Sequence, residues 1–366
     1  MRYIKAATVS AALLLCMAPF AYSHAAEIEG SDYQALIESI LDKAAVPFSG
    51  RVLLSKNGKL LASVTKGEGI TSNSSFVLAS QSKQITAVLI MQAVDNGKLN
   101  LKHTLNSYLT QQDTSKERQQ LTRYDDRITL EQLLSHTSGI NDLGNPNIFE
   151  PGTSFHYSNL GYTVLAQVLE QVNHLSFQEQ ITHLAQANQF IGVSARTGSI
   201  DMLHSQIASL AYGKTEENGK LSPTDITVTS DLLPAGGIIS TAPAFARFIH
   251  QLHTGQLMSD ASYQLMTQAH TMRPHRWPEI NYGYGLQISE YEDITEYSHG
   301  GYLPGYMSLS LHYPQVKLSL IMLENTSLSL KDRKRTFSLD DEMRAAMRTL
   351  VKPTGSADKN KSEKQY

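Results

Sequence analysis

The sequence predicts an α+β fold, in which an antiparallel sheet from the N- and C-terminal parts is flanked by helices and interrupted by an inserted, mostly helical region. Two apolar runs flank Asn57-Gly58, the strongest short-range signal of a β-hairpin. Near the other end, YMSLSLHY and KLSLIMLE predict two strands joined by a turn at Pro314-Gln315. Between these ends the apolar residues recur with a helical period. Strands at both ends with helices between them are typical of an α+β fold.

The individual elements follow in order, each supported by an apolar period, a cap or a turn signal. They are a helix at 32–45, the hairpin around Asn57-Gly58, a helix from Ile85 that ends near Asn96-Gly97, a short helix within 128–140 that starts at the capping box of Thr129 and Gln132 and has Gly139 as C-cap, a helix from Gly161, a helix from Ser240 that stops at Gly255, the two C-terminal strands, and a last helix at 339–350. Residues 177–225 show no clear pattern.

The first 25 residues predict a secretory signal peptide. Arg2 and Lys5 precede an apolar stretch, and Ser23 and Ala25 offer small side chains at the cleavage positions. The apolar stretch is too short for a transmembrane span. We therefore expect an exported protein, periplasmic or secreted, without a transmembrane anchor.

The remaining chain predicts one domain at 27–352, with a helical region at approximately 84–229 inserted in its α/β part. Residues 353–366 are polar and are expected to be disordered. Of the 366 residues, 41% are hydrophobic and 18% are charged, which is ordinary globular composition.

Charge and cysteine content exclude several function classes. Removing the signal peptide takes two of the 31 basic residues and leaves 29 against 34 acidic ones, so nucleic acid is not an expected partner. The one cysteine, Cys16, lies inside the signal peptide, so the mature chain has no disulfide and no thiol nucleophile. His250 and His253 have helical spacing but no H-E-x-x-H pattern, and we expect no metal and no cofactor.

The pattern Ser-x-x-Lys occurs three times, and geometry separates the copies. Ser63 lies in the second strand of the hairpin, where residues three apart point to opposite faces. Ser356 lies in the polar tail. Ser80 and Lys83 open a helix, where such residues share a face beside free N–H groups. Taken alone, this pair is more readily a helix cap followed by a solvated lysine.

Further motifs supply the context of Ser80. They are His136-Thr-Ser-Gly, Tyr157-Ser158-Asn159, the segment PAGGIISTA at 234–242, and His299-Gly300-Gly301. Singly, Tyr157 and Asn159 suit a loop with Asn159 as helix N-cap, and His299 suits a surface turn. In this order the motifs resemble the serine β-lactamase and penicillin-binding-protein superfamily, in its branch of class C β-lactamases, DD-peptidases and esterases. The likeness runs from about Phe48 to Glu324.

The resemblance implies a β-lactamase/transpeptidase-like fold and a role for each motif residue. Ser80 is the acylated nucleophile, and Lys83 activates it, alone or with Tyr157. The N–H groups of Ser80 and Tyr302 form the oxyanion hole. The implied substrate-binding residues are Asn159, His299, Gly300, Gly301 and Tyr302. Lysine can act as a base only when burial or a nearby positive charge lowers its pKa from about 10.4.

One motif departs from the class C pattern. Class C β-lactamases carry K-T-G where this chain has H-G-G, and the lysine and threonine help to hold a substrate carboxylate. Gly300 has no hydroxyl, and an unperturbed His299 is charged only below about pH 6.5. We therefore expect weak β-lactam hydrolysis, with carboxylate recognition improving as the pH falls toward 6.

The sequence thus predicts a secreted serine hydrolase that forms an acyl-enzyme on Ser80. Its substrate is expected to be an ester or amide of a small molecule or peptide, peptidoglycan-derived peptides included. D-amino-acid peptidase, DD-carboxypeptidase-like or esterase activity comes first, and class C-like β-lactamase activity second. A catalytically silent, penicillin-binding-like binding protein is the third alternative. The presence of Ser80, Lys83 and Tyr157 together argues against it, because a binding protein needs no such set.

Overall fold

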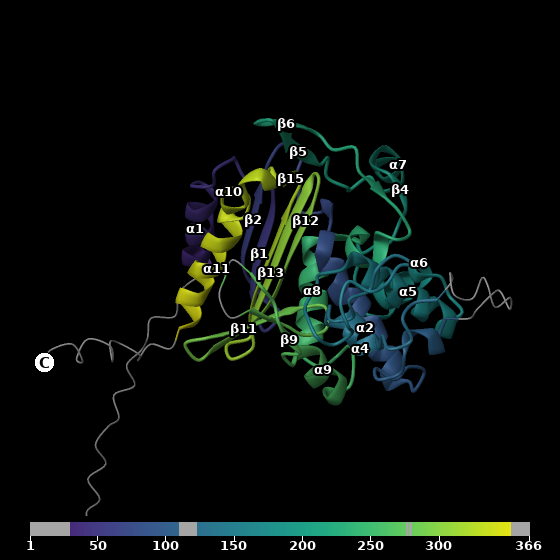
Figure 1. Cartoon of the computed structure of the whole chain (residues 1–366). Helices are drawn as coiled ribbons and strands as arrows, with labels where there is room; N and C mark the ends of the chain where they lie inside the picture. The colour runs from purple at the N-terminus through teal and green to yellow at the C-terminus, as the bar shows by residue number, and fades with distance from the viewer. Residues whose placement is uncertain (1–29, 110–122, 276, 278–279, 353–366) are drawn as a thin grey trace, which may run out of the picture.

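The computed structural model describes residues 30–109, 123–275, 277 and 280–352, and shows a sheet covered by helices on both faces (Figure 1). The predicted signal peptide and polar tail lie outside these residues. The described helices are α1 (Gly30–Leu41), α2 (Ser82–Asp95), α4 (Leu130–Leu134), α5 (Asn159–Asn173), α6 (Phe177–Ala187), α7 (Ile200–Gln206), α8 (Ala242–His253), α9 (Asp260–Thr267), α10 (Arg333–Thr336) and α11 (Ser338–Val351), with single turns η1 (Ala79–Gln81), η2 (Leu105–Ser107), η3 (Leu233–Gly237) and η4 (Leu330–Asp332).

The main sheet is antiparallel, with the spatial order β2-β1-β14-β13-β12-β11-β10-β9. Its strands are β1 (Gly50–Lys56), β2 (Lys59–Lys66), β9 (Thr271–Met272), β10 (Ile280–Tyr282), β11 (Gln287–Tyr291), β12 (Ile294–Leu303), β13 (Tyr306–Tyr313) and β14 (Leu318–Glu324). The two ends of the chain meet where β1 pairs with β14, and Gly50 lies opposite Glu324. The prediction of a sheet formed from both ends of the chain is confirmed.

Short strand pairs lie outside this sheet. They are β3 (Ser75–Val77) with β8 (Ile239–Thr241), β4 (Gly198–Ser199) with β7 (Thr227–Val228), and β5 (Lys214–Glu217) with β6 (Lys220–Pro223) and β15 (Thr326–Ser327). The β3–β8 pair joins the chain just before and just after the helices of the inserted region. That region also contains the β5–β6 hairpin, which the sequence pattern did not predict.

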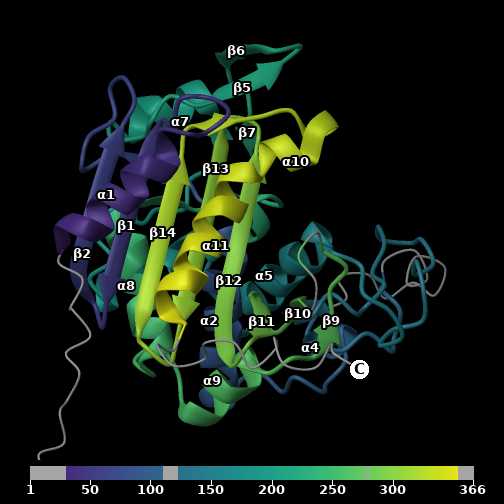
Figure 2. The same cartoon turned by 90° about the vertical axis from the view of Figure 1, so that its left-hand side faces the viewer.

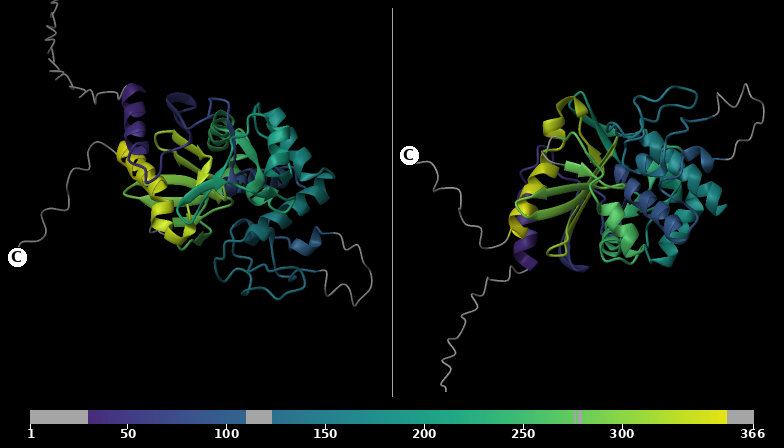
Figure 3. Two further views of the ribbon diagram at one scale, coloured as in Figure 1. Left: turned by 90° about the horizontal axis from the view of Figure 1, so that it is seen from above. Right: turned by 60° about the horizontal axis from the view of Figure 1, so that its bottom comes forward.

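Both faces of the sheet are buried, which explains its long apolar strands. Helices α1 and α11 lie side by side over one face (Figure 2), and α8 lies on the other with the inserted helices beyond it (Figure 3). Along β14, Leu320 and Met322 pack toward α11, whereas Ile321 and Leu323 belong to the larger core on the opposite face. Successive side chains of a strand point to opposite faces, so β14, which is covered on both faces, carries apolar residues on both sides.

The hairpin predictions are confirmed, and one helix end is wrong. Asn57 and Gly58 have φ values of 48° and 75°, as the tight turn between β1 and β2 requires. Helix α4 has the predicted capping box at Thr129, but it ends at Leu134 with Ser135 as its C-cap. Gly139 is therefore not the cap, because the chain already turns at His136, which has a φ of 62°. No described helix combines the length and apolar character needed to cross a bilayer.

Two buried histidines predict that acid destabilises the fold. The rings of His253 and His312 stack with centroids 4.0 Å apart. Burial lowers the pKa of His312 to about 3 and the pKa of His253 well below 6.5. The unfolded chain then binds protons that the folded chain does not, so stability is complete above pH 6.5 and is lost as the pH falls. Each group contributes up to about 1.4 kcal/mol per pH unit.

Urea unfolding between pH 7.5 and 5 measures this dependence. A variant with His253→Gln and His312→Gln is expected to have a shallower loss of unfolding free energy with acid than the wild type. His183→Gln is the control, because His183 is exposed on α6. An unchanged slope in the double variant would show that these rings do not set the acid sensitivity.

Candidate active site

Ser80 lies at a strained turn between β3 and α2. The N–H of Leu78 donates to the carbonyl of Ile238 at 2.8 Å, and the next residue, Ala79, has a left-handed φ of 48°. That conformation costs a non-glycine residue about 1–2 kcal/mol. Ser80 follows in η1, and the N-cap of α2 is Gln81, with no side-chain cap hydrogen bond. The Ser80 side chain is thus not a helix cap, and it lines a cavity of about 290 Å³.

Lys83 is completely buried and not a solvated helix residue. Its Nζ donates to Asn159 Oδ1 at 2.8 Å and to the carbonyl oxygen of Ala235 at 2.7 Å, and it lies 3.4 Å from Ser80 Oγ. A neutral amine has two N–H bonds and one lone pair. With both N–H groups donated to Asn159 and Ala235, the lone pair of a neutral Lys83 is left for the proton of Ser80.

The surroundings favour this neutral amine. Burial lowers the pKa of Lys83 well below its usual value, and the charge on Arg273 lowers it further. The Tyr157 hydroxyl is also buried, and it makes no hydrogen bond of normal geometry within the described residues. Burial raises the pKa of Tyr157 to about 12, although the Ser80 hydroxyl and the Arg273 charge act in the opposite direction. Lys83 is therefore suited to accept a proton at a lower pH than an exposed lysine, and Tyr157 to donate one.

The histidine of the HTSG motif holds the loop that carries Tyr157. The backbone N–H of Ser158 donates to His136 Nδ1 at 3.1 Å, and the His136 ring lies 4.3 Å from the ring of Tyr157. Burial lowers the pKa of His136 well below 6.5, so the ring stays neutral and can accept this bond. Ser158 caps α5 by accepting from Gly161 at 3.1 Å, which leaves Asn159 free to bind Lys83.

The PAGG segment, in η3, packs beneath the start of α2. Besides the bond from Lys83 to Ala235, the Thr86 hydroxyl donates to the carbonyl of Pro234 at 2.8 Å. A side chain on Gly237 would lie 2.5 Å from Val228. A glycine is needed at this position because Val228, in β7, packs closely against it.

The wall opposite Tyr157 is β12, and Gly301 allows its close approach to η1. A Cβ on Gly301 would lie 2.2 Å from Ser308 Oγ and 2.7 Å from the carbonyl oxygen of Leu78, whereas a Cβ on Gly300 would meet nothing closer than 3.9 Å. Only a glycine at 301 lets the strand lie against the turn that carries Ser80. The N–H groups of Ser80 and Tyr302, the expected oxyanion hole, belong to these two adjoining segments.

The side chain of His299 is not an exposed, titrating group. Its Nδ1 lies 2.6 Å from the carbonyl oxygen of Gly300, and its Nε2 lies 2.9 Å from the hydroxyl of Tyr282. The carbonyl can only accept, so Nδ1 carries the proton and Nε2 accepts from Tyr282. Burial lowers the pKa of His299 well below 6.5. The expectation that acid would charge this ring near pH 6 is therefore wrong.

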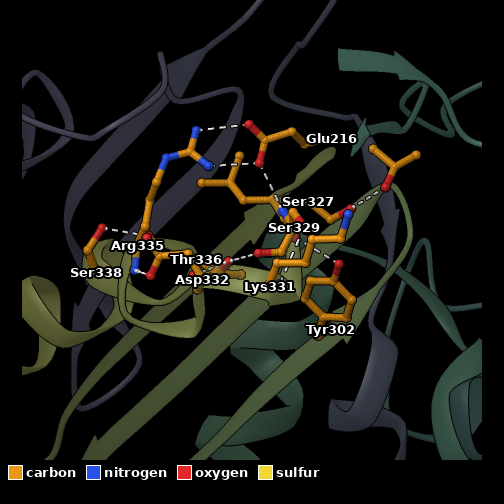
Figure 4. A network of polar contacts seen from close by, with 11 residues as sticks. Glu216, Tyr302, Ser327, Ser329, Lys331, Asp332, Arg335, Thr336 and Ser338 are labelled. Atoms are coloured by element: carbon orange, nitrogen blue, oxygen red, sulfur yellow. Dashed lines mark hydrogen bonds and ion pairs between the residues drawn. The ribbon is translucent and has the colours of Figure 1, made fainter. Parts of the chain in front are cut away.

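A polar network fixes the edge of the site at Tyr302. The Tyr302 hydroxyl donates to the carbonyl of Leu328 at 2.8 Å, and Figure 4 shows Tyr302 beside Ser327 and Ser329. Arg335 binds both carboxylate oxygens of Glu216, at 2.8 and 3.0 Å, and Glu216 accepts from the Ser329 N–H. The β5–β6 hairpin of the inserted region is thereby tied to the C-terminal segment beside β12.

Arg273 is one of the lining residues that the sequence motifs missed. It lines the same cavity, and its Cζ lies 5.0 Å from the centroid of the Tyr157 ring. The surrounding segment, TMRPHRWP, carries no periodic pattern or motif, so nothing local indicated a role. Arg273 reaches the site because β9 pairs with β10, a contact that only the folded sheet reveals.

Comparisons with known proteins agree with this architecture. The chain is 25% identical over 335 residues to penicillin-binding protein 4* of Bacillus subtilis, covering 80% of this chain and 71% of that protein. A penicillin-binding protein structure from Bacillus halodurans matches with a TM-score of 0.67 and 24% identity, over 86% of this chain and 98% of that one. A D-alanine carboxypeptidase from Burkholderia cenocepacia matches with a TM-score of 0.68 and 18% identity, over 86% and 99%.

A D-amino acid amidase from Ochrobactrum anthropi has the same fold, with a TM-score of 0.69 and 18% identity over 87% of this chain and 98% of that chain. These structural likenesses show the fold alone. The family assignment rests on the sequence, because residues 42–343 match the family model described as Beta-lactamase. The chain, with its eight-stranded sheet and its Ser80–Lys83 pair, therefore belongs to the beta-lactamase family of hydrolases.

Proposed function

We propose that this protein is an exported serine hydrolase that forms an acyl-enzyme on Ser80 and cleaves amide or ester bonds next to D-amino acids. The observation that carries the proposal is the contact of Lys83 with Ser80, Asn159 and Ala235 in one buried group. The comparison with a D-alanine carboxypeptidase and a D-amino acid amidase supports the substrate class. Export rests on the pattern of residues 1–25.

The proposed reaction has two acyl transfers. In the first, Ser80 Oγ bonds to the substrate carbonyl carbon while its proton passes to Lys83, and the bond to the leaving nitrogen breaks as that nitrogen receives a proton through Tyr157. In the second, a water oxygen bonds to the same carbon, the bond to Oγ breaks and a proton returns to Ser80. In both steps the oxyanion lies between the N–H groups of Ser80 and Tyr302.

Labelling with a fluorophosphonate and with a fluorescent penicillin tests this proposal. Mass spectrometry of the intact protein is expected to show one adduct, and peptide mapping is expected to place it on Ser80. Ser80→Ala should abolish labelling, whereas Ser63→Ala, in β2, should leave it unchanged. An adduct that persists in Ser80→Ala would contradict the assignment of the nucleophile.

The labelling experiment with fluorescent penicillin also distinguishes a peptidase from a β-lactamase. A class C-like β-lactamase is the second candidate function, and the charge of Arg273 beside Tyr157 favours it, because a β-lactam carries a carboxylate. A β-lactamase would release the penicillin rapidly as the hydrolysed product. A peptidase is expected to retain the penicilloyl adduct or to react with it slowly.

A further inference from the structure

The cavity that contains Ser80 also contains a cation that the proposed reaction does not use. Of the other basic residues that line it within the described chain, Arg344 is committed to a buried ion pair with Glu296, His299 is neutral, and His275 accepts from the N–H of Trp277 at 3.1 Å. Arg273 has none of these constraints. Its Nη1 is buried and makes no hydrogen bond within the described residues. A buried guanidinium N–H without a partner is costly, and a ligand oxygen would satisfy it.

The position of Arg273 is fixed by the edge of the sheet. It directly follows β9, and its backbone N–H donates to the carbonyl of Ile280, at the start of β10, at 2.8 Å. The guanidinium packs on two aromatic rings, with Cζ 5.0 Å from the centroid of Tyr157 and 5.8 Å from that of Tyr282. Stacking on these rings holds the planar fork beside the phenol that faces Ser80.

We propose that Arg273 binds the α-carboxylate of the leaving amino acid, so that the enzyme removes the last residue of a peptide. This inference rests on the proposed acyl-enzyme reaction. The leaving nitrogen must lie beside Ser80 and Tyr157 to receive its proton, and an α-carboxylate is only two bonds from that nitrogen. The Arg273 guanidinium, which stacks on Tyr157, therefore lies on the same side of the cavity as the leaving group. Arginine binds carboxylates in a bidentate manner, which fixes orientation as well as charge.

The opposite wall carries charges of both signs. Asp340 and Arg344, both on α11, line the cavity there, and Asp340 Oδ2 lies 4.0 Å from the position of a Cβ on Gly300. Arg344 is held by Glu296. The guanidinium of Arg273, beside Tyr157, is therefore the group we assign to the substrate carboxylate, in place of the lysine and threonine that β12 lacks.

A matched pair of thioesters tests the inference. The first is N-benzoyl-D-alanyl thioglycolate, whose free carboxylate lies two bonds from the leaving sulfur, and the second is its uncharged methyl ester. Thiol release gives kcat/KM for both in the wild type, in Arg273→Ala and in Arg273→Lys. Arg247→Ala is the matched control, because Arg247 is exposed on α8 and does not line the cavity.

Arg273→Ala is expected to lower kcat/KM for the free carboxylate by about 10- to 150-fold more than for the methyl ester, the range expected for a charge-assisted hydrogen bond. The effect of Arg273 on the pKa of Lys83 acts on both substrates and cancels in this ratio. Arg273→Lys keeps the charge without the fork and should lie between Arg273→Ala and the wild type. Arg247→Ala should match the wild type.

The outcomes separate this inference from the proposed function. Equal losses for the two thioesters in Arg273→Ala would overturn the inference, because a structural role affects both substrates alike. It would also be overturned if Arg273→Ala kept full activity and the wild-type ratio of kcat/KM between the two thioesters. A wild type that cleaves neither thioester and takes no label on Ser80 would instead overturn the proposed function, and the inference with it.

Discussion

Replacing Lys83 with methionine is expected to lower kcat/KM for an uncharged aryl ester by about 10²–10⁴-fold, the usual range for a lost general base. Methionine fills a similar volume but cannot accept the proton of Ser80. The wild-type rate should fall as the pH falls through the pKa of Lys83, because only the neutral amine is a base. Since burial lowers that pKa, the rate should reach its constant maximum well below pH 10.5.

Lys98→Met is the control, because Lys98 is exposed just after α2, its Nζ donates to Asn173, and neither residue lines the cavity of Ser80. It should keep wild-type turnover and the wild-type pH profile. Thermal melts of both variants show whether the fold survives. Full turnover by Lys83→Met would mean that another group activates Ser80. Tyr157→Phe should also slow the reaction, but as the loss of a proton donor, since the phenol is neutral at these pH values.

A single methyl group at Gly301 is expected to lower kcat by about 10²–10³-fold, the cost of losing one oxyanion donor. In Gly301→Ala the new Cβ would collide with Ser308 Oγ and with the Leu78 carbonyl oxygen. Ser308 can turn away only by giving up its 2.7 Å bond to that carbonyl, and the carbonyl can move only if η1 moves away from β12. Overpacking of this kind also destabilises a fold by about 1–3 kcal/mol.

Gly300→Ala is the matched comparison on the same strand. A Cβ at this position would meet its nearest atoms at ordinary contact distances of 3.9 and 4.0 Å. Its loss of kcat should be at least ten times smaller than that of Gly301→Ala, with steady-state kinetics and a melting curve measured for each. Equal losses in the two variants would show that the contact between β12 and η1 does not position the oxyanion donors.

The sequence allowed the sheet and the grouping of motifs to be predicted, because their signals are local. Asn57-Gly58 specifies its hairpin through φ values that few residues adopt. The order of the motifs that contain Ser80, Tyr157 and Gly301 predicted that these residues lie together in one site. The charge state of His299 could not be predicted, because it depends on burial beside Tyr282. Arg273 could not be found either, since two- and three-residue strands such as β9 and β10 leave no periodic trace.

The pairing of β1 with β14 has a kinetic consequence. Contacts between residues so far apart in the chain form slowly, because a long loop must close before they are made. During synthesis, Ser80 and Lys83 emerge early, whereas β12, with Gly301 and Tyr302, emerges late. A nascent chain that ends before β12 thus has the proposed nucleophile without the proposed oxyanion hole. In the proposed mechanism, hydrolysis begins only when the last strands join the first, so the chain is expected to be inert until its sheet is complete.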